Sequence, residues 1–274
     1  TADALIVRNQ TKVNQELLES ANQLRVIGRL GVGLDNIDLD ETDKRDVVVV
    51  FAKNANATSV AEYVISAMLT TRRSLYRASK DVKNGHWNRK KHTGDEISGK
   101  ILGLIGVGEI GHRVAWRAGA LGLHVMGYDP FVAPFDFPVT ESGIELASLD
   151  EVLRQSDFIS LHVPLTEGTK NLIDKKAMEK MKPTACIINT SRGGIVNEND
   201  LADALQNGTI SNAVLDVLEQ EPSDGNHPLL RLDNCMITPH IAGLTEDSQV
   251  RTSDMVANEV ICELEGKQSL CRVR

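Results

Sequence analysis

The sequence predicts an α/β fold in which a doubly wound parallel sheet is joined to a smaller α/β domain. From Lys100 onward, short apolar segments alternate with helical segments, a pattern typical of βαβ units and therefore of a parallel sheet. The turn Gly106-Val107-Gly108-Glu109-Ile110-Gly111 follows the first of these apolar segments and opens a helix. A dinucleotide-binding Rossmann domain requires this context of its glycine-rich turn.

The residues at the start of the chain predict a smaller domain built in the same way. Strands are expected at Leu5–Val7, Val26–Gly28 and Val47–Phe51, and helices at Gln15–Ala21 and Asp38–Arg45. This arrangement predicts a flavodoxin-like α/β domain. The chain starts at Thr1-Ala2-Asp3, without Met and directly before a strand, so we expect this domain to be truncated at its N-terminus.

A long helical segment is expected to follow the smaller domain. Thr58-Ser59 is predicted to cap this helix, with Glu62 close behind the cap, and the helix is expected to run to about Lys83. Gly85-His86-Trp87 is expected to end it.

Regular alternation then predicts the larger sheet. Strands are expected at Ile101–Ile105, Val125–Tyr128, Phe158–Val163, Cys186–Asn189, Ala213–Val217 and Met236–Thr238. Helices are expected at Val114–Leu121, Leu149–Gln155, Lys176–Met181, Glu198–Gln206 and Glu246–Leu264. The last helix is expected to return to the first domain. The predicted domains are therefore residues 1–56, the first part of a substrate domain, residues 57–242, the dinucleotide-binding domain, and residues 243–274, the return segment.

Composition restricts the class of protein. The 274 residues suffice for two ordinary domains, and a net charge of -8 argues weakly against a nucleic-acid partner. The four cysteines have no C-x-x-C spacing, and Cys186 and Cys235 lie in apolar segments, which favours buried, reduced thiols. No apolar stretch approaches membrane-spanning length and no signal-peptide pattern opens the sequence. We therefore expect a cytoplasmic protein without a membrane partner, and no metal site is predicted.

The glycine-rich turn predicts the nucleotide site. Gly106 permits the tight turn, Gly108 lets the backbone approach a pyrophosphate, and Gly111 lets the helix pack on the strand. Asp129 ends the next strand, where a carboxylate accepts the ribose hydroxyls and repels a 2′-phosphate, which favours NAD over NADP. The turn residues expected to contact the cofactor are Gly106, Gly108, Glu109, Ile110 and Gly111. The alternative is that the glycines only make a compact turn and that Asp129 only caps it.

Three ionisable residues, Arg192, Glu221 and His240, lie at or just past the ends of three successive apolar segments. Because open α/β sheets bind ligands at the carboxyl ends of their strands, the three are expected beside the cofactor. Arg192 can bind a carboxylate and polarise a carbonyl group. His240 can exchange a proton with the carbonyl oxygen, and Glu221 can fix its tautomer. Read singly, each could instead be an ordinary loop residue.

Several segments resemble the signatures of the D-2-hydroxyacid dehydrogenase family. They are Asn189-Thr190-Ser191-Arg192-Gly193-Gly194-Ile195-Val196-Asn197-Glu198, Leu215-Asp216-Val217 with Glu221-Pro222, Thr238-Pro239-His240-Ile241-Ala242-Gly243, Gly31-Val32-Gly33-Leu34-Asp35-Asn36-Ile37-Asp38 and Ser59-Val60-Ala61-Glu62. Within the family, Gly28-Arg29 and Gly85-His86-Trp87-Asn88-Arg89-Lys90-Lys91 are most similar to phosphoglycerate dehydrogenases and hydroxypyruvate reductases. The resemblance covers nearly the whole chain.

The resemblance implies an NAD-dependent oxidoreductase that forms a homodimer through its nucleotide domain. It implies that Arg192 binds the substrate carboxylate and that His240, paired with Glu221, is the acid/base. It also implies cofactor contacts from Thr190, Ser191, Asp216 and Gly243, with Asp216 near the nicotinamide carboxamide. Backbone around Arg8 and Asn9 is expected to contact the substrate.

The identity of the substrate stays open at this point. Arg8, Arg29 and the run Arg89-Lys90-Lys91 could bind a second anionic group, although a basic run usually faces solvent. Phosphoglycerate, hydroxypyruvate, glyoxylate and sulfolactate remain possible. The loop reads Arg8-Asn9-Gln10-Thr11, where phosphoglycerate dehydrogenases more often carry serine after the arginine. A second class of function is also open, an NAD-sensing binding protein, because some relatives resemble this fold but act as transcriptional corepressors. Turnover of a 2-keto acid distinguishes the two classes.

Overall fold

The structure, a computed structural model, describes residues 2–273 and divides into two compact units. Unit 1 comprises residues up to Ser59 together with the segment from Gly243 onward, and unit 2 runs from Val60 to Ala242. The first boundary therefore falls after Ser59 rather than after Asn56. Thr1 and Arg274 lie outside the described residues. No helix among residues 2–273 combines the length and the apolar composition needed to cross a membrane.

Unit 1 is a three-stranded parallel sheet between helices, with strand order β1-β2-β3. Its elements are β1 (Ala4–Val7), α1 (Gln15–Ser20), β2 (Val26–Arg29), α2 (Leu39–Asp43), β3 (Val48–Phe51) and α10 (Glu246–Leu264). Successive strand residues face opposite sides: Ile27 and Val49 share a core with Leu18, whereas Val26 and Val50 share one with α10. The chain past α10 returns along β3, where the Val273 N–H donates to the Val49 carbonyl oxygen (2.8 Å).

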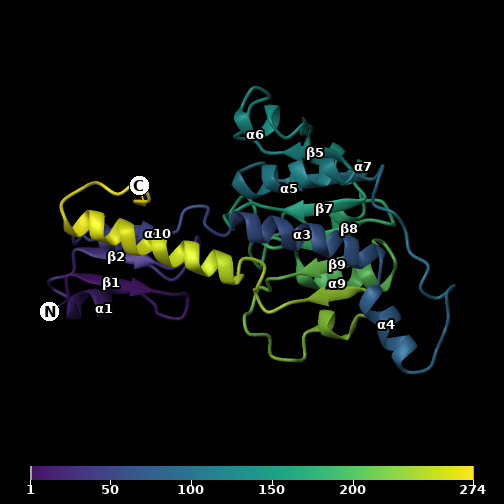
Figure 1. The fold of residues 1–274 in the computed structure, drawn as a ribbon, viewed down its shortest axis with the longest axis horizontal. Coiled ribbons are helices and arrows are strands. Elements are labelled where there is room, and N and C mark those ends of the chain that lie inside the picture. The colour runs from purple at the N-terminus through teal and green to yellow at the C-terminus, as the bar shows by residue number, and fades with distance from the viewer. Residues whose placement is uncertain (1, 274) are drawn as a thin grey trace. The chain divides into compact units, whose positions relative to one another are not determined.

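Unit 2 is a doubly wound sheet of seven parallel strands in the order β10-β9-β8-β7-β4-β5-β6. Its strands β5, β7, β8 and β9 are labelled in Figure 1. Its strands are β4 (Ile101–Ile105), β5 (His124–Tyr128), β6 (Glu145–Leu146), β7 (Phe158–Leu161), β8 (Cys186–Asn189), β9 (Asn212–Leu215) and β10 (Cys235–Ile237). Its helices are α3 (Ala57–Arg72, which begins in unit 1), α4 (Leu75–Lys83), α5 (Glu109–Ala120), α6 (Phe137–Thr140), α7 (Leu149–Gln155), α8 (Lys175–Met178), α9 (Glu198–Gln206) and the 3₁₀ helix η1 (Pro228–Arg231).

Each face of the seven-stranded sheet has its own apolar core. Leu102 and Leu104 of β4 pack with residues of α3 and α5, and Ile105 packs with residues of α7 and α9. Six strands had been predicted from the sequence. The additional edge strand β6 has two residues, too few to show an alternating pattern, and α6 has only four.

The prediction of one long helix from Thr58-Ser59 to Lys83 is wrong. The helix begins earlier, at Ala57, so Ser59 lies inside it, and the Ser59 hydroxyl group instead bonds the Thr245 hydroxyl group (2.9 Å). It ends at Arg72, and α4 begins at Leu75. The Arg72 carbonyl oxygen accepts the Asp95 N–H (3.3 Å) and its guanidinium donates to the Thr184 carbonyl oxygen (2.8 Å). Contacts with distant segments thus stop a helix that local sequence would continue.

Candidate active site

One register row crosses six neighbouring strands of unit 2 at the same level. It joins Tyr128, Ile105, Leu161, Asn189, Leu215 and Ile237. The residues that directly follow this row are Asp129, Gly106, His162, Thr190, Asp216 and Thr238. Because all six strands are parallel, these residues share the carboxyl edge of the sheet. The glycine-rich turn and the segments that carry Arg192, Glu221 and His240 therefore leave the sheet from one edge.

The glycine-rich turn has the geometry that a dinucleotide pyrophosphate requires. Gly106 has a left-handed φ of 95°, and a Cβ placed on it would lie 2.4 Å from the His162 carbonyl oxygen. A Cβ on Gly111 would lie 2.4 Å from the Gly106 carbonyl oxygen, so α5 packs directly on the turn. A Cβ on Gly108 would meet nothing within 4 Å, and no side chain caps the N-terminus of α5 there. Backbone N–H groups at that N-terminus suit an anion.

Glu109 and Asp129 complete the turn. The Glu109 carboxylate pairs with Arg113 one helical turn later, which offsets its negative charge beside a pyrophosphate. Asp129 accepts the Val107 N–H at 2.9 Å and the Phe131 N–H at 3.0 Å, one with each carboxylate oxygen. Asp129 therefore caps the glycine-rich turn, which is the role that the alternative interpretation of the sequence gave it. Each oxygen keeps a further lone pair, so capping leaves acceptor capacity for ribose hydroxyl groups.

The turn that carries Arg192 is held together by the side chain of Asn189. Asn189 is 2% exposed, accepts from the Ser191 N–H (3.0 Å) and hydroxyl group (2.8 Å), and donates to the Arg192 carbonyl oxygen (2.8 Å). The Arg192 guanidinium donates to the Ser191 carbonyl oxygen at 2.7 Å. Thr190, between them, has a buried hydroxyl group with no hydrogen-bond partner among the described residues. An orphaned hydroxyl group at this edge fits a bound cofactor.

The structure brings Glu221 and His240 together. His240 donates from Nδ1 to Glu221 Oε2 at 2.8 Å, and the other Glu221 oxygen accepts the Leu218 N–H at 3.0 Å. The His240 side chain remains 49% exposed, so its ring has an accessible edge. This is the pairing expected from the sequence, and it fixes the tautomer with Nε2 unprotonated when the ring is neutral.

Asp216 shapes the backbone around His240. Its carboxylate accepts from the Thr238 hydroxyl group (2.6 Å) and from the Ile241 (2.8 Å) and Ala242 (2.7 Å) N–H groups. Its carbonyl oxygen accepts the His240 N–H at 2.9 Å. His240 has a left-handed φ of 56°, a conformation that a non-glycine residue keeps only where its surroundings enforce it. Asp216 is 1% exposed, so its observed role is structural, and the nicotinamide contact stays a prediction.

Tyr63 and His162 were not selected from the sequence. Tyr63 of α3 shares a 2.6 Å hydrogen bond with the Thr238 hydroxyl group, and burial raises the pKa of its phenol. His162 follows β7 beneath the glycine-rich turn, and burial lowers the pKa of its ring to about 3. His162 Nδ1 is buried without a partner among residues 2–273, although part of the residue is accessible. The only sequence signal for His162 was its place directly after a strand, and Tyr63, inside helix α3, had none.

The predicted substrate residues of unit 1 differ in their surroundings. Arg29 is buried, and its guanidinium donates to Asn36 Oδ1 (3.1 Å) and to the Leu30 carbonyl oxygen (2.5 Å). Asn36 in turn donates to the carbonyl oxygens of Arg8 (2.9 Å) and Thr11 (2.6 Å), so Arg29 and Asn36 together shape the loop that contains Asn9. A direct contact of Arg29 with substrate stays a prediction.

Gly243 also belongs to unit 1, where a Cβ placed on it would lie 2.5 Å from Asn56 Nδ2. This close contact explains the glycine, whereas its predicted contact with the cofactor stays a prediction. The Arg8 side chain donates to Gln249 Oε1 at 3.2 Å on the surface of the same unit.

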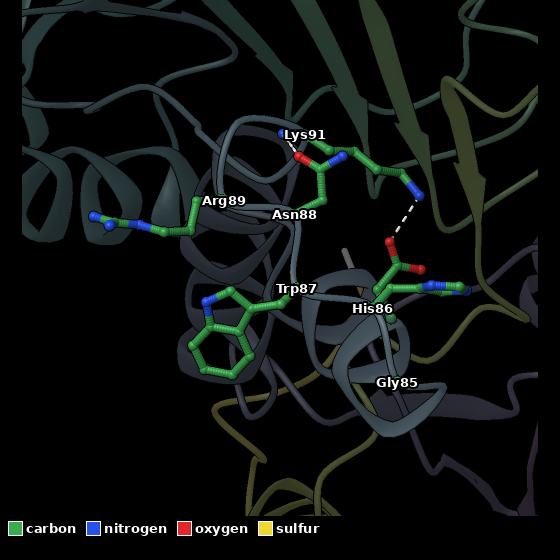
Figure 2. A pocket seen from close by; sticks show the side chains of 7 residues that line it. Gly85, His86, Trp87, Asn88, Arg89 and Lys91 are labelled. Carbon is green, nitrogen blue, oxygen red and sulfur yellow. Dashed lines mark hydrogen bonds and ion pairs between the residues drawn. The ribbon is translucent and has the colours of Figure 1, made fainter.

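The basic run Arg89–Lys91 lies in a different place from the carboxyl edge. Arg89 and Lys91 line a shallow surface pocket next to α4, in which Lys91 pairs with Asp81 at 2.7 Å and Arg89 extends away from that pair (Figure 2). The flanking segments are attached near the amino ends of strands. The Arg77 side chain donates to the Asp233 carbonyl oxygen (2.9 Å) just before β10, and the Asp95 N–H donates to the carbonyl oxygen of Arg72, whose side chain reaches Thr184 just before β8. The structure therefore favours the reading of a solvated basic turn.

Comparison with known proteins gives the chain a family. Residues 65–242 match the family model of the D-isomer specific 2-hydroxyacid dehydrogenase NAD binding domain. The chain is 43% identical to D-3-phosphoglycerate dehydrogenase of Methanocaldococcus jannaschii over 97% of its own length and 50% of that protein. It is 44% identical to (S)-sulfolactate dehydrogenase of Chromohalobacter salexigens over 94% of its own length and 83% of that protein.

A solved structure of D-lactate dehydrogenase from Aquifex aeolicus, complexed with NAD and lactic acid, superposes with a TM-score of 0.86. It is 34% identical in sequence, and the match covers 97% of this chain and 84% of that one. The chain spans about half the length of the phosphoglycerate dehydrogenases that it matches. The family model and the sulfolactate dehydrogenase match place it in one family. The chain belongs to the D-isomer specific 2-hydroxyacid dehydrogenases.

Proposed function

We propose that this protein is an NAD-dependent oxidoreductase that interconverts a small D-2-hydroxy acid and the corresponding 2-keto acid. The observation that carries the proposal is the 2.8 Å Glu221–His240 pair at the sheet edge that also holds the glycine-rich turn. When bound, NADH supplies the hydride that C2 of the keto acid accepts. The same reduction needs a proton at the keto oxygen and a cation for the carboxylate.

His240 is the proton donor in this proposal. Protonated, it carries one hydrogen toward Glu221 through Nδ1 and another on Nε2, which is the nitrogen free to face a substrate. Transfer of the Nε2 proton to the keto oxygen leaves the neutral tautomer that Glu221 already stabilises. In the opposite direction, the same nitrogen removes the hydroxyl proton of the 2-hydroxy acid.

Arg192 binds the substrate carboxylate in this proposal. Its guanidinium presents several donors in one plane, which matches the two oxygens of a carboxylate. Thr190, Ser191, Gly108 and Asp129 contact the cofactor. The polar loop with Arg8 and Asn9 favours a small anionic substrate, as do the phosphoglycerate and sulfolactate dehydrogenases among the relatives. Arg29 supports that loop through Asn36.

The direct test is a spectrophotometric screen with NADH and NADPH against hydroxypyruvate, glyoxylate, 3-sulfopyruvate and phosphohydroxypyruvate. We expect turnover of at least one acid with a preference for NADH, because Asp129 repels a 2′-phosphate. Arg192→Ala tests the assigned carboxylate contact, and this variant should have a higher KM and a lower kcat for the same acid. No turnover by the wild-type protein would overturn the proposal and favour an NAD-binding protein without this activity.

Cofactor binding can be tested without turnover. Gly108→Ala adds a methyl group where the protein leaves open space, so we expect an unchanged melting temperature and weaker NADH binding by fluorescence titration. Gly111→Ala is the contrasting variant, because its Cβ would collide with the Gly106 carbonyl oxygen and should lower the melting temperature. Full NADH affinity in Gly108→Ala would exclude a pyrophosphate at this turn.

We also propose a cytoplasmic homodimer formed through unit 2. Helix α4 has no buried residue, and Leu75 and Tyr76 are 72% and 81% exposed. Trp87, in the loop after it, is 79% exposed, so an apolar surface is available to a second copy. Sedimentation should give a mass of twice the 29.9 kDa chain mass, and Tyr76→Glu should lower the measured mass.

The cytoplasmic location is supported by the cysteines. All four cysteines are unpaired, and burial raises the pKa values of Cys186 and Cys235 to about 12, which suits a reducing compartment.

A further inference from the structure

Unit 2 contains a second glutamate–histidine pair, which the proposed reaction does not use. His227 Nε2 donates to Glu198 Oε2 at 2.8 Å, and the Leu229 N–H donates to the other ring nitrogen of His227 at 3.3 Å. Glu198 begins α9, and His227 precedes η1. The side chains of Glu198 and His227 are only 9% and 20% exposed, so this pair is largely withdrawn from solvent.

The other oxygen of Glu198 holds the loop that carries Glu221. Glu198 Oε1 accepts the Glu219 N–H at 2.6 Å. The preceding N–H group, that of Leu218, donates to Glu221 Oε1 at 3.0 Å. Two successive backbone groups of one loop are thus bound by two glutamates, and the second of these glutamates bonds His240. The position of Glu221 therefore depends on a peptide that Glu198 holds.

The same peptide rests on the turn that carries Arg192. A Cβ placed on Gly193 would lie 2.1 Å from the Leu218 carbonyl oxygen and 2.4 Å from the Glu219 nitrogen. The Leu218–Glu219 peptide is therefore in direct contact with the backbone next to Arg192. Only a glycine permits this approach, because any larger residue would push the peptide, and Glu221 with it, away from the Arg192 turn.

We infer that Glu198 and His227 are positioning residues that join the Arg192 turn to the Glu221 loop and so keep Glu221 aligned with His240. Glu198 holds the Leu218–Glu219 peptide against Gly193, and His227 holds Glu198 in the orientation that reaches this peptide. The kinetic consequence rests on the proposed function. The geometric consequence, the tautomer of His240, does not.

Glu198→Ala removes both acceptors, and Glu198→Gln keeps one acceptor for Glu219 but places an amide against His227. His227→Gln keeps a donor near Glu198. Asp157→Ala and Asp157→Asn are matched controls, because Asp157 also anchors a backbone N–H, that of Ile101 (2.9 Å), but directly before β7, at the amino end of the sheet. All variants are made in the full chain.

The first readout is the ring-nitrogen NMR spectrum of His240, recorded through its carbon-bound protons at a pH where the ring is neutral and assigned by loss of the signals in His240→Gln. We expect the wild-type protein and both Asp157 variants to show the Nδ1–H tautomer. In Glu198→Ala the signals should move toward a mixture of tautomers. A wild-type tautomer in all Glu198 and His227 variants would overturn the inference.

The second readout is steady-state kinetics with NADH and the best keto acid. Glu198→Ala should lower kcat about tenfold, which is less than the roughly hundredfold loss that a misplacement of about 1 Å can cause, with KM for NADH within about twofold. The conservative Glu198→Gln and His227→Gln variants should lose less, and they carry both readouts if Glu198→Ala does not fold. A loss equal to that of the Asp157 variants would reduce the pair to ordinary stabilisation. Inactive wild-type protein would refute the proposed function, and the NMR result would still decide the inference.

Discussion

Unit 2 contains the same chemical pair twice, and the two pairs differ in burial rather than in distance. Both the Glu221–His240 and the Glu198–His227 contacts measure 2.8 Å. The side chains of the first pair are 38% and 49% exposed, whereas those of the second are 9% and 20% exposed. A short glutamate–histidine contact therefore does not by itself identify an acid/base. Accessibility of the second ring nitrogen separates a ring that can exchange protons with a ligand from one that fixes a loop.

The backbone of the two histidines points to the same distinction. His240 has a left-handed φ of 56°, enforced by the bonds that Asp216 makes to the residues around it, whereas His227 has an ordinary φ of -55°. His227 has both ring nitrogens engaged within the protein. Strain at His240 presents one ring edge outward, and strain of this kind is concentrated at functional sites.

The largest expected difference between the pairs is in rate. His240→Ala should lower kcat for the best keto acid by roughly a hundredfold or more, the usual contribution of a positioned acid/base. His227→Gln should lose no more than about tenfold, because its effect is indirect. Steady-state NADH oxidation measures both, with His86→Gln, an exposed histidine, as the control. Equal losses of kcat in the two variants would contradict the assignment of His240, and not His227, as the acid/base.

A smaller difference is expected in the free energy of unfolding, and here the buried Glu198–His227 pair should contribute more than the Glu221–His240 pair. Glu198→Ala leaves the Glu219 N–H and the His227 ring without their acceptor in a buried place, and should lower the free energy of unfolding by about 1–3 kcal/mol. Glu221→Ala should lower it by less than about 1 kcal/mol, since water can reach the groups it leaves. Urea denaturation of both variants measures this. A greater loss in Glu221→Ala would contradict the assignment of the buried pair as the structural one.

His162 offers a third imidazole, which is largely buried and bonds the Ser160 hydroxyl group (3.0 Å) instead of a carboxylate. Its pKa is lowered to about 3, so between that value and the ordinary value near 6.5 the unfolded chain binds a proton that the folded protein does not. Its contribution to stability is therefore complete above about pH 6.5 and is lost as the pH falls, by up to about 1.4 kcal/mol per pH unit.

Substituting His162→Gln should make the free energy of unfolding less dependent on pH between about pH 4 and pH 6. Urea denaturation across this range, with His86→Gln as the exposed control, measures the slopes. An unchanged slope would mean that the His162 ring remains able to bind a proton in the folded protein.

Strands and strand ends were predictable because their signals are local. Ile101–Ile105 and Cys186–Asn189 are mostly apolar segments, and both appear as strands with the predicted bounds. Helix α9 and helix α10 also have the bounds predicted from their apolar periodicity. The break between α3 and α4 was not predictable, since it depends on Asp95 and Thr184, which are distant in sequence from Arg72.

For the candidate site, the sequence alone determined which residue types follow the strands. A glycine turn follows β4, and an arginine, a glutamate and a histidine follow β8, β9 and β10. Parallel strands bring such residues to one edge whatever the details of packing. Only the tertiary structure decided that Glu198 meets His227, 29 residues away, and that their contact fixes the loop of Glu221. No periodicity relates the two residues, because crossover connections, and not spacing along the chain, bring α9 and η1 together.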